Sequence, residues 1–228
     1  MKKTLSAQEW MENIETLFLQ HADSKKAPAM EAYMKNNFRF LGISKPERAA
    51  LSKTLYGYYG KPSLEVLHDL VPLLWEQPYR EYHYMALECL YFQHKHFQPS
   101  DLPLFEYLLR KNTWWDSVDF ISPKLVAALC LRYPELLATT IERWSNDANF
   151  WMRRAALLIQ LKYKSHTQTE LLFACIRKLA HEKEFFIRKA IGWTLRELAK
   201  TDADLVMDFV ETNSLSTLSR KEALKHIG

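Results

Sequence analysis

Glycine is scarce in this chain, with only five among 228 residues, and no segment sustains the alternation of apolar and polar residues that marks a strand. These two absences predict an all-α protein. No apolar run approaches the length of a membrane span, and the opening stretch MKKTLSAQEWMENIETLF lacks the hydrophobic region of a signal peptide. We therefore expect a soluble cytoplasmic protein with no membrane partner.

Cysteine is also rare, and its spacing excludes the usual cysteine chemistry. Cys89, Cys130 and Cys175 lie far apart, with neither a CxxC pair nor a histidine at ligand spacing. They predict buried thiols in a reducing compartment. Four histidines lie on helical stretches without carboxylates at the spacing a metal needs: His68, His83, His94 and His96. We read these histidines as surface or packing residues and expect no metal site.

The composition is that of a globular chain with a mild excess of positive charge. The length fits one domain or a single repeat array. A net charge of +4 permits a polyanionic partner without requiring one. Between residues 150 and 196, lysines and arginines alternate with aromatic residues. Basic groups of this kind can meet phosphates while aromatic rings pack on sugars or bases.

Apolar residues at helical spacing predict a series of helices without a dividing linker. We expect helices at residues 7–20, 27–38, 64–75, 80–93, 102–111, 115–131, 134–145, 150–164, 169–181, 185–200, 203–211 and 219–227. A further helix is expected to begin at Pro46 and to end between Gly57 and Gly60. Leu41, Gly42 and Ile43 form an expected turn. Pro123 predicts a bend or a restart within its helix.

A 35-residue repeat runs through the second half of the chain, and residues 84–87 match residues 154–157 two periods later. The stretch FWMRRAA at 150–156 aligns with FFIRKAI at 185–191, and the same offset takes Asp119 to Arg154. A period of this length with two helices per repeat predicts a stacked helical solenoid. Equivalent positions would then line one concave surface, so Asp119, Arg154 and Lys189 are expected side by side, with Trp115 and Trp193 one turn away.

The stretch TWWDSVD at residues 113–119 is the first candidate for chemistry. Trp115 and Asp119 are four residues apart, so they share a helix face. A carboxylate beside an indole face suits a cation held against an aromatic wall. The alternative is that both tryptophans belong to the core and that Asp116 caps the helix.

Several stretches, taken together and in order, resemble the AlkD-type DNA alkylation-repair glycosylases, which are HEAT-like solenoids: FLGISKPER, WWDSVD, WMRRAALLIQLKYK, KEFFIRKAIGWTLRELAK and LSRKEALKHI. The resemblance runs from Tyr33 to the C-terminus and implies one domain, 1–228. It implies an enzyme that wraps duplex DNA in a basic concave groove. Such an enzyme hydrolyses the N-glycosidic bond of cationic alkylpurines such as 3-methyladenine and 7-methylguanine, without metal, cofactor or base flipping. It also implies a monomer in the bacterial cytoplasm that joins the nucleoid when on DNA.

The resemblance assigns roles to individual residues. The family's catalytic carboxylate falls on Asp119, the indoles that pack against the lesion's deoxyribose on Trp115 and Trp193, and the phosphate-holding arginine on Arg154. Further expected DNA contacts are Tyr33, Arg48, Lys53, Lys189 and Arg196. The chain departs from the family pattern at Ser44, Lys45 and Ala49, which puts its lesion preference and affinity in question.

Two other functions stay open on the residues alone. One is a non-catalytic member of the same superfamily that binds damaged or branched DNA. The other is a protein-interaction scaffold, in which Asp119 and Arg154 would be an ion pair between repeats and Trp193 a core residue. The scaffold does not need Trp115, Asp119 and Trp193 on one face, and the binder would be expected to lose the carboxylate or the indoles. We therefore favour the glycosylase.

Overall fold

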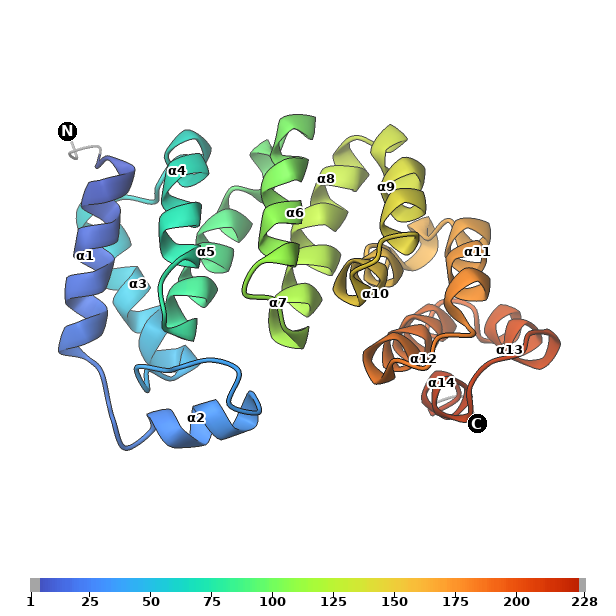
Figure 1. Ribbon diagram of the computed structural model, residues 1–228. Helices are drawn as coiled ribbons and strands as arrows, with labels where there is room; N and C mark the ends of the chain where they lie inside the picture. Colours follow the sequence, from blue (N-terminus) through green and yellow to red (C-terminus); the bar gives the residue numbers. More distant parts are fainter. Residues whose placement is uncertain (1–4, 226–228) are drawn as a thin grey trace. The chain divides into compact units, whose positions relative to one another are not determined.

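The computed structural model describes residues 5–225, which form helices joined by turns (Figure 1). The chain divides into two compact units, residues 1–97 and 98–228. The first unit holds α1 (Ala7–Gln20), α2 (Ala27–Tyr33), α3 (Lys45–Tyr59), α4 (Leu64–Trp75) and α5 (Arg80–Phe92). The second holds α6 (Leu102–Arg110), α7 (Trp115–Phe120), α8 (Ala127–Arg132), α9 (Glu135–Ser145), α10 (Phe150–Leu158), α11 (Thr169–Leu179), α12 (Phe185–Ala199), α13 (Ala203–Thr212) and α14 (Thr217–Ala223). The predicted all-α class is confirmed.

Helix starts are encoded locally by hydroxyl and carboxylate pairs. At α1, the backbone N–H of Glu9 donates to Ser6 Oγ over 3.2 Å, and the backbone N–H of Ser6 donates to the Glu9 carboxylate over 2.9 Å. At α3, the N–H of Ser44 donates to the Glu47 carboxylate over 2.8 Å. These hydrogen bonds satisfy N–H groups that a helix start leaves without an intrahelical partner.

The 35-residue period reappears in the helix starts. α3, α5, α7, α10 and α12 begin at Lys45, Arg80, Trp115, Phe150 and Phe185, each 35 residues after the one before. The repeat that the sequence shows between residues 84 and 191 therefore extends back to α3. The repeat crosses the division between the two units. The single repeat domain expected from the sequence stays a prediction.

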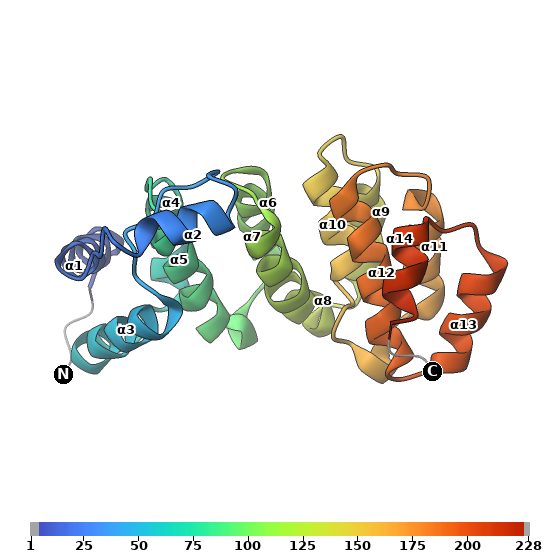
Figure 2. The same cartoon turned by 90° about the horizontal axis from the view of Figure 1, so that it is seen from below.

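Within residues 98–228, α7, α10, α12 and α14 follow one another as one row of contacting helices, and α9 and α11 pack against each other beside it (Figures 1 and 2). Polar contacts join residues about one period apart. Lys178 Nζ lies 3.0 Å from the Glu142 carboxylate, and the Tyr163 hydroxyl donates to the Ala127 carbonyl over 2.9 Å. Each repeat thus packs mainly on its neighbour, as in other solenoids.

Within residues 1–97, a buried carboxylate holds the turn before α3. Glu81 accepts hydrogen bonds from the backbone N–H groups of Leu41, Gly42 and Ile43 at 3.0, 3.0 and 3.1 Å. Gly42 has a φ of +87°, and a Cβ on it would lie 2.0 Å from the Asp23 carbonyl oxygen. Residues 41–43, where a turn is expected, form a non-helical connection, and Gly42 is the residue that lets the chain adopt it.

Three expected helices end more than two residues away from their expected ends. The second stops at Tyr33 because Lys35 and Asn36 both adopt a φ of 57°, which the right-handed helix excludes. The helix expected over 150–164 ends at Leu158. The final helix, expected over 219–227, spans Thr217–Ala223, and residues 226–228 lie outside the described part of the chain.

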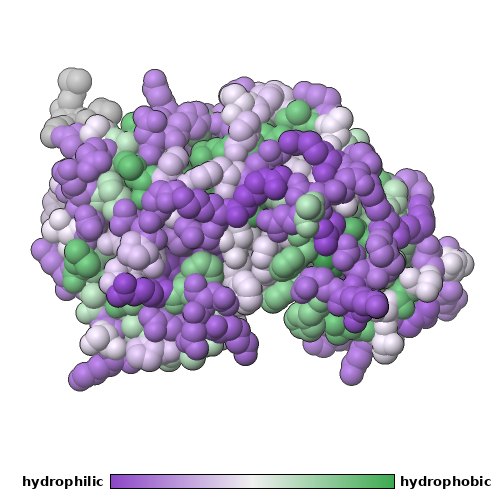
Figure 3. Space-filling model, viewed as in Figure 1, coloured by the Kyte–Doolittle hydropathy of each residue, from purple (hydrophilic) through white to green (hydrophobic). Residues whose placement is uncertain are grey.

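The core holds the three thiols, and the visible surface is mostly polar. Cys89, Cys130 and Cys175 are buried, as predicted, and burial raises the pKa of each thiol to about 12. On the face that Figure 3 shows, hydrophilic residues predominate with hydrophobic ones scattered among them. None of the helices within residues 5–225 is long and apolar enough to cross a membrane.

Candidate functional site

Two hydrogen bonds of the Ser117 hydroxyl form the start of α7. The N–H of Trp114 donates to Ser117 Oγ over 3.2 Å, and that hydroxyl donates to the Trp114 carbonyl over 3.0 Å. Trp114 therefore occupies the cap position and Trp115 begins the helix. Asp116 lies in the first turn, so its interpretation as the cap is wrong. A carboxylate in the first turn still complements the helix dipole.

The backbone after Asp119 is irregular for a physical reason. Pro123 has no N–H, so it cannot donate to the carbonyl of Asp119 four residues earlier. The α-helix ends at Phe120, a π-helical turn spans Ile121–Val126, and the α-helix resumes at Ala127. This confirms the break predicted at Pro123. Turns of this kind are frequent at functional sites.

The carboxylate of Asp119 is held by the guanidinium of Arg154. Arg154 Nε donates to Asp119 Oδ1 and Nη2 donates to Oδ2, each over 2.9 Å. Nη1 donates to the carbonyl of Phe186 at the start of α12. The Arg154 side chain is 5% exposed and that of Asp119 is 19% exposed. A two-pronged pair of this kind fixes the plane of the carboxylate as well as its position.

Capping side chains set the two helices that supply these contacts. The Asn149 side chain accepts from the N–H of Trp151 over 2.9 Å and starts α10. The Glu184 carboxylate accepts from the N–H of Phe186 over 3.3 Å and starts α12. Because α7, α10 and α12 begin in the same phase of the repeat, Asp119, Arg154 and the Phe186 carbonyl meet on three successive helices.

Burial decides how readily Asp119 ionises. Withdrawal from water raises the pKa of the Asp119 carboxyl to about 6, while the charge and hydrogen bonds of Arg154 act in the opposite direction. The nearby charge of Asp116 adds to the rise. The carboxylate is therefore largely ionised at neutral pH and takes up a proton near pH 6.

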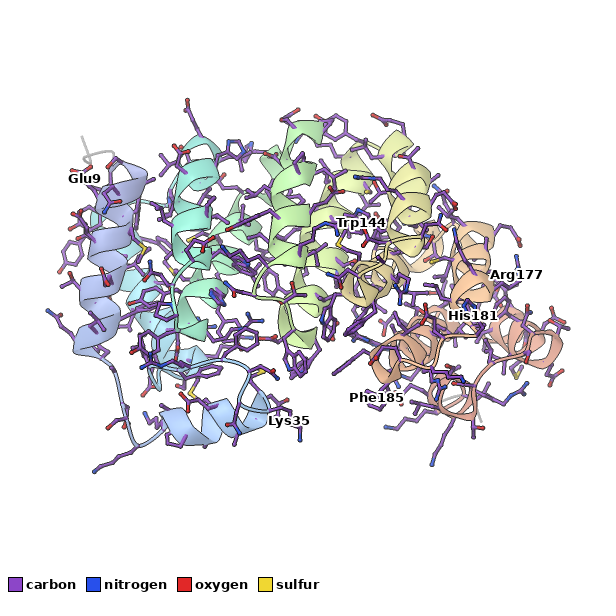
Figure 4. The ribbon with its side chains drawn as sticks, viewed as in Figure 1. Glu9, Lys35, Trp144, Arg177, His181 and Phe185 are labelled. Atoms are coloured by element: carbon purple, nitrogen blue, oxygen red, sulfur yellow. The ribbon has the colours of Figure 1, made fainter. Side chains whose placement is uncertain are left out.

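Aromatic rings cluster at the same end of these helices. Trp114 lies 5.4 Å from Trp151 and 5.5 Å from Phe186, measured between ring centroids. Phe150 stacks on Phe186 at 6.5 Å. Phe185, labelled at the start of α12 in Figure 4, is 55% exposed. The sequence indicated aromatic residues here, but only the shared helix phase shows that they form one cluster.

The two tryptophans assigned to catalysis are half-buried. Trp115 is the first residue of α7 and lies one turn before Asp119. Trp193 lies on α12, seven residues or about 10 Å along the helix from Phe186. Among residues 5–225, no hydrogen bond, ion pair or ring contact joins Trp193 to Asp119 or Arg154. The structure joins the two charged residues, and the roles of both indoles stay predictions.

Lys189 and Arg196, two expected DNA contacts, share one partner that the sequence did not reveal. Lys189 Nζ lies 2.6 Å from Glu222 Oε2, and Arg196 Nη1 pairs with Glu222 Oε1. Glu222 belongs to α14, which approaches α12 closely at Gly192. A Cβ on Gly192 would lie 2.5 Å from the Glu222 Cβ and 2.7 Å from the Ser219 carbonyl oxygen.

The expected DNA contacts in the first unit differ in accessibility. Tyr33 is 67% exposed, and Lys53 is exposed as well. Arg48 is 4% exposed, its Nη2 lies 2.8 Å from the Glu88 carboxylate, and its guanidinium stacks 4.7 Å from the Tyr84 ring centroid. In this structure Arg48 is therefore a packing residue. Its predicted phosphate contact would require the guanidinium to leave Glu88.

The start of α3 carries the three departures from the family pattern. Ser44 occupies the cap position, and Lys45 and Ala49 are exposed on the first turns of the helix. None of the three takes part in the core, so they change the exposed surface of α3 and not its packing.

Arg153 and Arg188, neighbours of the assigned residues, are structural. Arg153 Nη1 donates to the Asp147 carbonyl over 2.7 Å, and its Nε lies 2.8 Å from the Glu182 carboxylate. Arg188 Nε donates to the Glu182 carbonyl over 3.0 Å. Both therefore fix the loops before α10 and α12.

Comparison with known proteins decides the family. The family model described as DNA alkylation repair enzyme matches residues 14–227. This chain belongs to that family. The resemblance to AlkD-type proteins is thereby confirmed, and the family implies DNA as the substrate.

Solved structures agree with the assignment. The chain is 33% identical to a protein described as a predicted DNA alkylation repair enzyme from Enterococcus faecalis, with a TM-score of 0.84, and the match covers 91% of this chain and 97% of that one. Two structures from Streptococcus mutans share the fold at 20% identity and a TM-score of 0.61. One is smu.31 (80% of this chain, 92% of that chain) and the other AlkD2 (81% and 90%). Curated protein sequences gave no match.

Proposed function

We propose that this protein is a DNA glycosylase that hydrolyses the N-glycosidic bond of cationic alkylated purines in duplex DNA. The observation that carries the proposal is the Asp119 carboxylate, which Arg154 orients through two hydrogen bonds and which keeps partial access to solvent. A structural ion pair alone would not need Trp115 one turn away on the same face. The proposal needs no metal or cofactor.

The chemistry asks for little beyond such a carboxylate. An alkylated purine already carries a positive charge, so it leaves with the electron pair of the broken C1′–N bond and needs no proton. The sugar then develops oxocarbenium character, and a water molecule adds its oxygen to C1′ and loses a proton. A carboxylate aimed at the developing charge stabilises that state electrostatically.

Arg154 supports this role by positioning. Two of its nitrogens hold Asp119 and the third holds the Phe186 carbonyl, so the carboxylate cannot rotate away from the direction that the pair imposes. The family resemblance also assigns Arg154 a phosphate contact. Trp115 and Trp193 would supply indole faces for the cationic sugar or base, an interaction of about 0.5–2 kcal/mol each.

The proposal is tested by single-turnover release of 7-methylguanine from methylated duplex DNA. Asp119→Asn keeps the shape of the side chain and removes its charge, so release should slow by roughly 10²–10³-fold. Binding to the same duplex, measured separately, should stay unchanged or tighten because a carboxylate near phosphates is gone. Asp208→Asn, on the exposed face of α13, is the matched control and should release base at the wild-type rate.

Other outcomes point elsewhere. Release by Asp119→Asn at the wild-type rate would make the carboxylate structural and the mechanism wrong. DNA binding by the wild type without any release would favour the non-catalytic binder, and the absence of both would favour the interaction scaffold.

A further inference from the structure

Glu222 forms ion pairs with Lys189 and Arg196, the two cations on α12 that are expected to contact DNA. Its Oε2 lies 2.6 Å from Lys189 Nζ and its Oε1 pairs with Arg196 Nη1, while the Glu222 carbonyl accepts a second, longer bond from the same nitrogen at 3.5 Å. One carboxylate thus serves two cations and leaves a net charge of +1 in the trio. The side chains of Lys189, Arg196 and Glu222 are 37%, 19% and 14% exposed, so the trio lies at the surface.

Contacts other than that carboxylate also join α14 to α12. Ser216 caps α14 by accepting from the N–H of Ser219 over 3.1 Å, and Ser219 Oγ donates to the Arg188 carbonyl on α12 over 3.0 Å. Gly192 leaves room for the close approach, and Ala223 is fully buried. A hydroxyl bond and apolar packing thus support the position of the helix beside the ion pairs, so the charge of Glu222 can serve another role.

The trio shares the side of α12 that carries Trp193. Positions 189, 193 and 196 recur at helical spacing, so the two cations flank the indole along one stripe of the helix. A duplex whose sugar reached Trp193 would bring its phosphates within range of Lys189 and Arg196. Carboxylate and phosphate accept the same hydrogen bonds from these donors.

We propose that Glu222 is an internal competitor of the DNA phosphate. Its carboxylate holds Lys189 and Arg196 in the free protein, and a backbone phosphate replaces it when duplex DNA binds. Glu222 thereby keeps both cations in place between binding events and lowers the affinity for any duplex, which favours release of undamaged DNA. Glu222 is a positioning residue in this scheme, and the scheme rests on the proposed function.

The experiment measures affinity for an unmodified duplex as a function of salt. Glu222→Gln should bind about three- to tenfold more tightly near 0.1 M salt, the scale of losing one or two surface ion pairs. The plot of log affinity against log salt should also become steeper, by up to about 1, because no released carboxylate then takes up a cation. Glu211→Gln, an exposed carboxylate on α13, changes the net charge equally and should alter affinity by less than about twofold.

A double-mutant cycle separates competition from a general charge effect. In a Lys189→Gln/Arg196→Gln background, Glu222→Gln should no longer tighten binding, because the cations it would free are gone. Glu222→Asp keeps the charge but shortens the reach, so its affinity should lie between those of wild type and Glu222→Gln. This variant decides the question if Glu222→Gln does not fold, which thermal unfolding will show.

Three results would overturn the proposal. The first is tightening by Glu222→Gln (or by Glu222→Asp, should only that variant fold) no greater than that of Glu211→Gln. The second is tightening that persists without Lys189 and Arg196. The third is the absence of duplex binding at low salt in every variant. Base release is scored separately, so tighter binding without any 7-methylguanine release would contradict the glycosylase and leave the competitor role standing.

Discussion

Arg154 binds both oxygens of Asp119 and reaches a third acceptor, the carbonyl of Phe186, with its remaining nitrogen. The guanidinium of Arg154 on α10 therefore joins α7 and α12, the corresponding helices of the repeats before and after its own. The arrangement explains how a partly buried carboxylate can be both ionised and fixed: the guanidinium supplies the counter-charge, and the bond to Phe186 prevents it from turning.

Replacing Arg154 with Lys should separate orientation from charge. Lysine keeps the positive charge but cannot donate two parallel bonds and a third. Loss of one charge-assisted bond costs about 1.5–3 kcal/mol, so single-turnover release of 7-methylguanine should slow by about 10- to 100-fold. Arg177→Lys, on the exposed side of α11, is the control and should leave release unchanged. Full activity in Arg154→Lys would show that charge alone suffices.

The release rate should depend on the ionisation of Asp119. Burial raises the pKa of Asp119 to about 6, so the active, ionised form dominates only above that pH. Below about pH 5 the rate should rise about tenfold per pH unit, the rise should become shallower near pH 6, and the rate should level off above about pH 7. The measurement is a pH series at saturating enzyme, and the residual rate of Asp119→Asn should be flat across it.

The contacts of the candidate site that the sequence could predict are those between residues one repeat apart. The 35-residue offset placed Asp119 against Arg154 because period-related positions touch in a solenoid, and the structure shows that contact. The repeat did not predict the ion pairs of Glu222. α14 begins at Thr217, out of phase with the starts of α7, α10 and α12, and Glu222 lies 33 residues from Lys189. A 35-residue repeat does not predict an ion pair between residues whose spacing differs from 35.

Two other limits have local causes. The early end of α2 rests on Lys35 and Asn36 in a left-handed conformation, which non-glycine residues rarely adopt. Asparagine adopts it more readily than most residues, but Lys35 gives no such signal. Arg48 matched a DNA contact by type and position, but its burial against Glu88 and Tyr84 depends on a packing partner 40 residues away. Type and spacing do not reveal which surface a side chain meets.

The two indoles should affect chemistry more than binding. Trp115→Ala and Trp193→Ala should each slow release of 7-methylguanine by about 2- to 30-fold, the range of one cation–π contact. Trp115→Phe should recover part of the loss because a smaller aromatic face remains. Affinity for unmodified duplex should change little in all three variants. A fall in affinity with an unchanged maximal rate would instead make the indoles binding residues.

Two glycines of the first unit predict opposite effects on stability. Gly42→Ala forces a Cβ to within 2.0 Å of the Asp23 carbonyl at a φ of +87°, so the free energy of unfolding should fall by about 3 kcal/mol or more. Gly57 lies inside α3 and has open space around its Cβ direction, so Gly57→Ala should raise that free energy by up to about 1 kcal/mol.

Chemical denaturation followed by circular dichroism compares these two variants with the wild type. Because Glu81 binds the N–H of Gly42, Gly42→Ala should also release the turn that precedes α3. Hydrogen exchange at Leu41 and Ile43 should then accelerate while α4 stays protected, since local opening exposes only the groups that the turn covers. An unchanged midpoint in Gly42→Ala would mean that the backbone at residue 42 can relax, and the close approach to Asp23 would then not constrain the fold.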